Sequence, residues 1–213
     1  MKTEELVNML ATGLEATQVR PLSRRYATAL AIGTGIAVML MLSLLHVRSD
    51  LARAAFLPAF WLKVGFVASL VAVSLFAAMR LSRPGARVEV LPAVVAAPLL
   101  LMWAVAAWML IAAEPGQRTQ MFLGETWKVC PFLIATLSIP IFVVLMRVMK
   151  GFAPTRPRLA GAAAGLLAGA SAALVYCLHC PEMDAPFIAF WYVLGMLIPV
   201  AAGALLGKTL LRW

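Results

Sequence analysis

The sequence predicts an all-α, polytopic membrane protein with six transmembrane helices and a short N-terminal amphipathic helix. Three observations carry this prediction: 63% of the 213 residues are hydrophobic, apolar stretches of spanning length recur along the chain, and short polar connections separate them. A soluble globule needs more polar surface than this composition offers. Runs of about 20 apolar residues are helical in lipid because every backbone polar group must be bonded within its own segment.

The apolar stretches are each long enough to cross a hydrocarbon core of roughly 30 Å, and they cover residues 26–46, 57–79, 90–113, 130–149, 159–178 and 187–206. We therefore divide the chain into an arm, residues 1–25, and a transmembrane domain, residues 26–213. The first stretch is too long for a signal-peptide core and follows an acidic segment, so we expect it to be retained as a membrane span.

The basic residues are distributed unevenly between the two ends of the predicted helices. Of the 18 Lys and Arg residues, 13 fall on the side that carries the N-terminus and 5 on the other side. Because cytoplasmic loops are enriched in Lys and Arg, this bias predicts that both termini are cytoplasmic. Topology thus accounts for the net charge of +9, and we expect no direct nucleic-acid partner.

The arm has the pattern of an amphipathic helix over residues 3–17, which Pro21 ends. Its apolar face is formed by Leu6, Met9, Leu10 and Leu14, with acidic side chains opposite. A helix this short is marginal alone. Membrane-surface helices carry Lys and Arg on the polar face, so the acidic face favours a groove on a protein partner over lipid. We expect a protein to bind the arm.

The cysteines gather at the outer ends of two spans. Cys130 opens the fourth span, whereas Cys177 and Cys180 close the fifth. The turn near residues 150–158 is short, which favours adjacent antiparallel helices and places the two sites together. In the fifth span Gly161, Gly165 and Gly169 form a stripe that lets another helix approach closely. Cys180 lies nearer to that stripe than Cys177, so it is the better-placed partner for Cys130.

The chemistry of the thiols is open between two alternatives. An oxidising outer compartment permits a disulfide between Cys130 and Cys180, and the two thiols with His179 are also suited to a soft metal such as zinc or cadmium. Cys177 is read as a small buried hydrophobe, or as a further thiol of the same cluster. No resident cofactor is expected.

The spans contain no Asp or Glu well inside them, and ion pathways need such groups. A transporter is therefore disfavoured. Lys63 lies about one turn inside the second span, and we expect its side chain to snorkel outward beside Trp61.

Several motifs together resemble the NrsF family of bacterial inner-membrane proteins. The motifs are Phe152-Ala-Pro-Thr-Arg156-Pro-Arg158 before the glycine stripe, Leu178-His-Cys-Pro-Glu182, Phe190-Trp-Tyr-Val-Leu-Gly195 and Trp127-Lys-Val-Cys130-Pro131. The resemblance implies a non-enzymatic anti-sigma factor that holds a cytoplasmic sigma factor of the extracytoplasmic-function (ECF) class at the membrane. It also implies that a heavy-metal or oxidant signal releases the sigma factor, with Cys130 and Cys180 as family cysteines.

The sequence-based hypothesis is thus a two-state membrane regulator with a sigma factor and lipid as partners and no small-molecule substrate. A membrane thiol-disulfide oxidoreductase is the alternative from another class, but such enzymes usually relay electrons between two cysteine pairs and this chain has three cysteines. A soft-metal carrier is disfavoured by the lack of acidic residues inside the spans.

Overall fold

The computed structural model describes residues 5, 21–83, 85 and 88–211, and it confirms an all-α protein with six helices long and apolar enough to cross a membrane. The spans are α2 (Leu22–Leu44), α4 (Pro58–Leu81), α5 (Leu91–Ala112), α7 (Cys130–Lys150), α8 (Pro157–Tyr176) and a last span of α9 (Ala185–Phe187), η1 (Ile188–Tyr192) and α10 (Val193–Leu210). The predicted arm helix, with Leu6, Met9, Leu10 and Leu14, lies outside the described residues.

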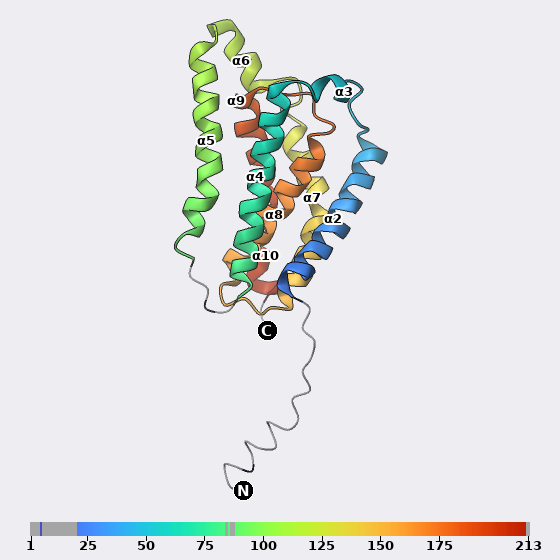
Figure 1. Ribbon diagram of the computed structural model, residues 1–213, viewed down its shortest axis with the longest axis vertical. Helices are drawn as coiled ribbons and strands as arrows, with labels where there is room; N and C mark the ends of the chain where they lie inside the picture. The colour runs from blue at the N-terminus through green and yellow to red at the C-terminus, as the bar shows by residue number, and fades with distance from the viewer. Residues whose placement is uncertain (1–4, 6–20, 84, 86–87, 212–213) are drawn as a thin grey trace.

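Helix α8 forms the centre of the bundle. Its sequence is rich in Ala and Gly and most of its side chains are buried, because α4, α7 and α10 pack around it. Helix α2 packs mainly on α7, and α5 stands at the edge against α4 and the start of the last span (Figure 1). The short helices α3 (Leu51–Ala54) and α6 (Pro115–Leu123) connect spans at one end.

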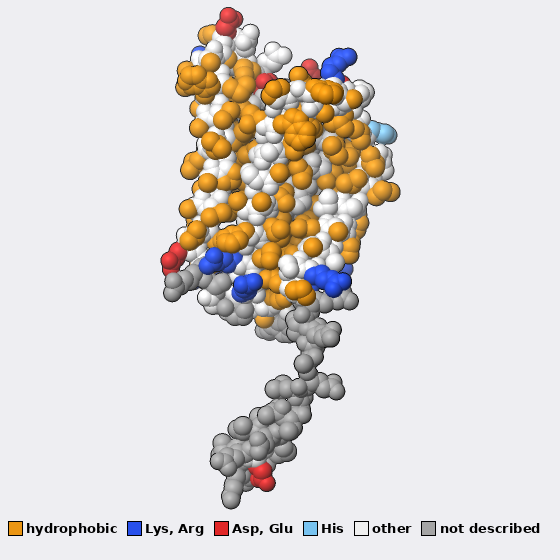
Figure 2. All heavy atoms as spheres, viewed as in Figure 1, with side chains coloured by type: hydrophobic (Ala, Val, Ile, Leu, Met, Phe, Trp, Pro, Cys, Tyr) orange, Lys and Arg blue, Asp and Glu red, His pale blue; other side chains and the backbone are white. Residues whose placement is uncertain are grey.

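The two ends of the bundle differ in their side chains. We call the end with Cys130, Cys177 and Cys180 the thiol end, and the end with Arg25, Arg80 and the connection between α7 and α8 the arginine end. Figure 2 shows Lys and Arg side chains at the arginine end below a broad hydrophobic band. This band is the surface that lipid would cover, since large apolar side chains such as Trp108 and Leu101 are exposed on it.

Small residues bring α8 and α10 into backbone contact. A Cβ atom on Gly161 would collide with the carbonyl oxygen of Gly203, and one on Gly165 with that of Pro199. At Gly169 an added Cβ would lie 3.0 Å from Met196 Cα. The glycine stripe of the fifth span therefore faces the sixth span. In lipid, where apolar burial between helices gains little, such close packing is a main source of helix association.

The last span begins with a π-helical turn that shapes the thiol end. Five residues, Ile188–Tyr192, form η1 before regular α-helix resumes. The Trp103 Nε1–H group of α5 donates a hydrogen bond to the Ala189 carbonyl oxygen at 3.0 Å. A π-helical turn rotates the side chains that follow it and is frequent at functional sites. Here it contains the buried Tyr192, which lies beside the cysteines.

Candidate functional site

The thiol end brings two of the three cysteines into contact. Cys130 is the first residue of α7, and Cys180 lies in the turn after α8. Both are fully buried, and their side chains are neighbours. Cys177 is buried one turn earlier, next to Tyr192, and all three cysteines are free thiols. The structure therefore assembles the Cys130 and Cys180 pair, with Cys177 to one side.

A carboxylate connects the two segments that carry the pair. Glu182 Oε1 accepts hydrogen bonds from the backbone N–H groups of Glu125 at 2.8 Å and Thr126 at 3.2 Å. The Thr126 carbonyl in turn accepts the Cys130 N–H at 2.9 Å, so the anchored segment leads directly into α7. Hydrogen bonds to a charged acceptor are stronger than neutral ones. Glu182 thus holds the start of α7 in register with the Cys180 turn.

Gly124 makes room for this carboxylate. It has a φ of +56° and a ψ of −163°, a conformation essentially restricted to glycine. A Cβ atom at this position would lie 2.7 Å from the Glu182 carboxyl carbon. The close approach of Gly124 and Glu182 therefore requires a residue without a side chain.

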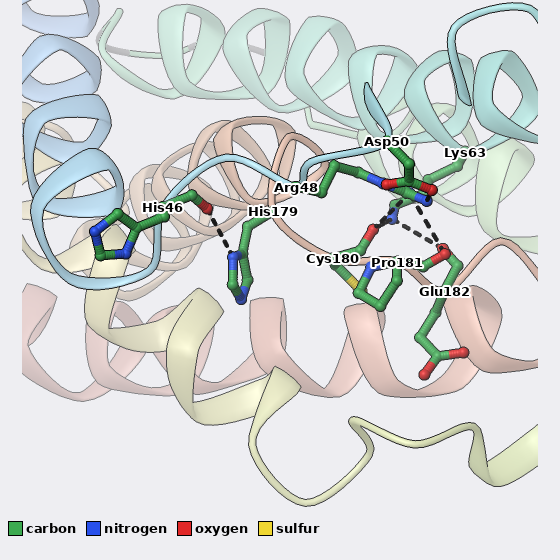
Figure 3. Close-up of polar contacts among 8 residues, drawn as sticks. All are labelled: His46, Arg48, Asp50, Lys63, His179, Cys180, Pro181 and Glu182. Atoms are coloured by element: carbon green, nitrogen blue, oxygen red, sulfur yellow. Dashed lines mark hydrogen bonds and ion pairs between the residues drawn. The ribbon is translucent and has the colours of Figure 1, made fainter. Parts of the chain in front are cut away.

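Lys63 lies inside the bundle, and the expectation that it snorkels outward was wrong. Its side chain is fully buried, and Nζ donates hydrogen bonds to the carbonyl oxygens of Cys180 and Glu182, both at 2.9 Å (Figure 3). The ammonium group also lies 5.1 Å from the centre of the Tyr192 ring. The physical reason is that the turn after α8 exposes carbonyl groups with no helical partner, and in a low dielectric they bind a cation well.

A second cation reaches the same turn from the loop after α2. Arg48 Nη1 donates to the Cys180 carbonyl oxygen at 3.2 Å, and its guanidinium forms a two-pronged ion pair with Asp50 at 2.6 and 2.7 Å (Figure 3). The Arg48 guanidinium lowers the pKa of Asp50, mainly through these hydrogen bonds. Arg48 is therefore neutralised locally.

His179 points away from the cysteine pair. Its Nδ1 atom lies 2.9 Å from the His46 carbonyl oxygen, and Figure 3 shows the ring on the His46 side of the turn. Across the residues that the structure describes, no group of three or more His, Cys, Asp or Glu side chains is arranged to hold a metal ion. Metal binding by Cys130, Cys180 and His179 stays a prediction that this arrangement does not support.

The environment makes the two cysteines of the turn chemically different. Burial raises the pKa of Cys177 to about 11, whereas the hydrogen bond from Cys130, together with the Lys63 charge, holds the pKa of Cys180 below its ordinary value. The two cysteines of the turn therefore lie in different electrostatic environments.

An open cleft of about 400 Å³ lies beside the site at the thiol end. It is bordered by α6 and by the turn after α8, and its lining residues are Gln117, Gln120, Met121, Gly124, Glu125, Pro181, Glu182 and Asp184. Burial, together with the neighbouring Glu182, raises the pKa of Asp184. The cleft is lined by Pro181 and Glu182 of the turn that contains Cys180, whereas the Cys180 side chain itself is buried.

Fold and site together define a polytopic helical membrane protein with a buried thiol pair at one end. The chain belongs to the NrsF family, whose description is negative regulator of sigma F and whose match covers residues 10–213. A protein of Azospira oryzae named probable anti-sigma-F factor NrsF is 60% identical over the full length of both chains. The anti-sigma-F factor NrsF of Caulobacter vibrioides is 36% identical, again over the whole of both. No solved structure matches the chain.

Four residues of the site escaped the sequence reasoning: Lys63, Arg48, Glu182 and Tyr192. Lys63 meets the Cys180 turn across 117 residues of sequence, and Arg48 across 132. Contacts between residues so far apart in sequence leave no local pattern from which they could be predicted. The one available signal was a lysine one turn inside an apolar span, since intramembrane cations usually face a partner inside the protein.

Proposed function

We propose that this chain is an anti-sigma factor of the inner membrane that holds a cytoplasmic ECF sigma factor and releases it on a thiol-reactive signal, a heavy metal or an oxidant. The observation that carries the proposal is the buried Cys130 and Cys180 pair at the thiol end, opposite the arginine end. The names of the two relatives support the sigma factor as partner.

The thiol pair is well placed to change the packing of two spans. Cys130 begins α7, and Cys180 follows the end of α8, and both helices run from the thiol end to the arginine end. With hydrogen peroxide as oxidant, two thiols and one peroxide molecule give one disulfide and two water molecules. A disulfide between Cys130 and Cys180, or a reagent bound to their sulfurs, favours the arrangement of α7 and α8 that accommodates it. The equilibrium between the sigma-binding and the sigma-releasing arrangement shifts accordingly.

The sigma-binding element in this proposal is the arm, through Leu6, Met9, Leu10 and Leu14. Its apolar face and acidic polar face suit a groove on a protein. The arm precedes α2, which begins at Leu22 at the arginine end. With the N-terminus in the cytoplasm, the arm lies on the side where a sigma factor is found.

Co-purification of the full chain with its sigma factor tests the proposal. We expect the complex to dissociate when a peroxide or a soft metal is added, and the Cys130→Ser/Cys180→Ser double variant to retain the sigma factor under the same treatment. Cys177→Ser is the matched control, since it removes a buried thiol outside the pair, and it should respond like the unaltered chain. Equal release from the double variant would contradict the sensing role. Retention of the sigma factor after deletion of residues 1–20 would contradict the arm as its binding element.

A further inference from the structure

An apolar groove of about 370 Å³ lies at the arginine end between α4, α5 and α8. All of its lining side chains are Ala, Val, Leu or Pro; α5 contributes Ala96 and Leu99, and α8 contributes Ala162 and Leu166. The main contacts of α5 are with α4 and, at the thiol end, with α9 and η1 (Figure 1). The groove is the space that this packing leaves beside α8.

A second, basic hollow of about 330 Å³ adjoins this groove at the start of α8. Its lining residues are Arg156, Pro157, Arg158, Leu159 and Lys208, and Leu159 lines the apolar groove as well. The three basic side chains are exposed, and none of them forms an ion pair with a residue that the structure describes. Three positive charges thus border one end of an apolar groove.

We propose that the groove and the basic hollow together bind one anionic phospholipid. The acyl chain lies in the groove, whose lining offers no hydrogen-bonding side chain and therefore suits a hydrocarbon chain. The headgroup lies among Arg156, Arg158 and Lys208, because basic pockets between spans attract anionic headgroups and Arg binds phosphate oxygens in a two-pronged geometry. The bound lipid bridges α5 and α8 and offsets part of the positive charge of the arginine end.

Two other occupants fit the groove less well. The polar face of the arm carries Glu4, Glu5 and Glu15, and its entry would bring carboxylates to the depth of the spans, where they are costly. A second copy that docked through its spans would bring no carboxylate to offset the basic hollow, since the spans have no Asp or Glu well inside them. Glu89 follows the groove residue Val88 in sequence but lines neither hollow. The charge pattern therefore favours a lipid with a negative headgroup.

Native mass spectrometry of the full chain in detergent tests the headgroup half of the proposal. Phosphatidylglycerol, which is anionic, and phosphatidylcholine, which is neutral overall, are compared with identical acyl chains. We expect phosphatidylglycerol to bind more tightly, and Arg158→Gln/Lys208→Gln to weaken its binding roughly five-fold for each charge removed. The matched control is Arg24→Gln/Lys150→Gln, which removes two exposed charges of the same end that line neither hollow, and it should bind like the unaltered chain.

Filling the groove tests the acyl-chain half. Ala96→Phe places a ring in the groove and should weaken the binding of both lipids. Ala97→Phe is its control, because Ala97 is exposed on α5 and does not line the groove. In the unaltered chain, phosphatidylglycerol with a photoreactive diazirine in its acyl chain should label α5 and α8.

Equal affinity for the two lipids would overturn the proposal, as would unchanged phosphatidylglycerol binding in Arg158→Gln/Lys208→Gln or labelling confined to helices outside the groove. A dimer that Ala96→Phe abolishes would show instead that the groove takes a second copy, and a crosslink from the arm to Ala162 would show that it takes the arm. The labelling experiment needs no substitution, so it decides the question even if a variant fails to fold. None of these measurements involves a sigma factor.

Discussion

At the scale of single residues, the site depends on a carboxylate and a glycine that meet across the thiol end. Glu182 accepts the Glu125 and Thr126 N–H groups, and Gly124 leaves space for it. Thr126 lies one helical turn before Cys130, and Glu182 lies two residues after Cys180. The distance between the two thiols is thus controlled by a contact that involves neither sulfur.

We predict that Glu182→Ala and Gly124→Ala slow disulfide formation between Cys130 and Cys180. Losing the carboxylate leaves two N–H groups without their acceptor, at a cost of about 1–3 kcal/mol, and the added methyl group displaces the same carboxylate. The rate of loss of free thiols under peroxide measures the effect. Gly116→Ala is the control, because a Cβ atom there meets no neighbour within 4 Å. Unaltered rates in both variants would show that the contact does not position the pair.

At the scale of elements, the pairing of α8 with α10 determines where the thiol turn lies. The chain runs from α8 through the Cys180 turn into the last span. The glycine contacts between α8 and α10 therefore hold together the two helices that this turn connects. On the other side α7 packs against α8 and brings Cys130 to the turn. Small residues are needed here because the helix backbones touch.

We predict that Gly165→Ala destabilises the protein and that Gly35→Ala does not. The added methyl group at Gly165 would collide with the Pro199 carbonyl group, and overpacking of this kind costs about 1–3 kcal/mol. Gly35, on the exposed face of α2, has nothing within 4 Å of an added Cβ. Thermal unfolding in the same detergent compares the two variants. A midpoint for Gly165→Ala equal to that of the control would contradict the close α8–α10 contact.

At the scale of the whole molecule, the two ends carry different chemistry and are joined by rigid spans. The thiol end combines the buried cysteine pair, Lys63 and an open cleft, and the arginine end collects exposed basic side chains. A regulator that detects a signal on one side of a membrane and acts on the other needs this polarity. The proposal therefore depends on which end faces the cytoplasm.

We predict that the thiol end faces the outer compartment, because the basic residues concentrate at the other end. Single cysteines at Gly116→Cys and Lys150→Cys, both exposed, report the two ends when the three native cysteines are replaced by Ser. A membrane-impermeant maleimide should label Gly116→Cys in intact spheroplasts and Lys150→Cys only after lysis. The reverse pattern would invert the orientation and remove the basis for an outward-facing sensor.

Much of this architecture was predictable from the chain alone, and particular elements show why. The six spans match the predicted stretches closely: the fourth was predicted at residues 130–149 and α7 is Cys130–Lys150. The glycine stripe identified a face of α8 but not its partner, α10. The adjacency of Cys130 and Cys180 followed from the short connection between two antiparallel helices. The inward direction of the Lys63 side chain could not be predicted from the sequence. A lysine near the end of a span can extend outward or inward with little difference in local pattern.

The sequence by itself determined the helices, their number and the uneven distribution of charge, because transfer of an apolar segment into lipid and the pairing of its backbone groups are local properties. Only the tertiary structure decided that Lys63 binds the Cys180 turn, that Glu182 anchors the segment before Cys130 and that His179 turns aside. These contacts join residues more than 50 positions apart. They exist because helix packing brings unpaired carbonyl and N–H groups together in a low dielectric, where each must find a partner.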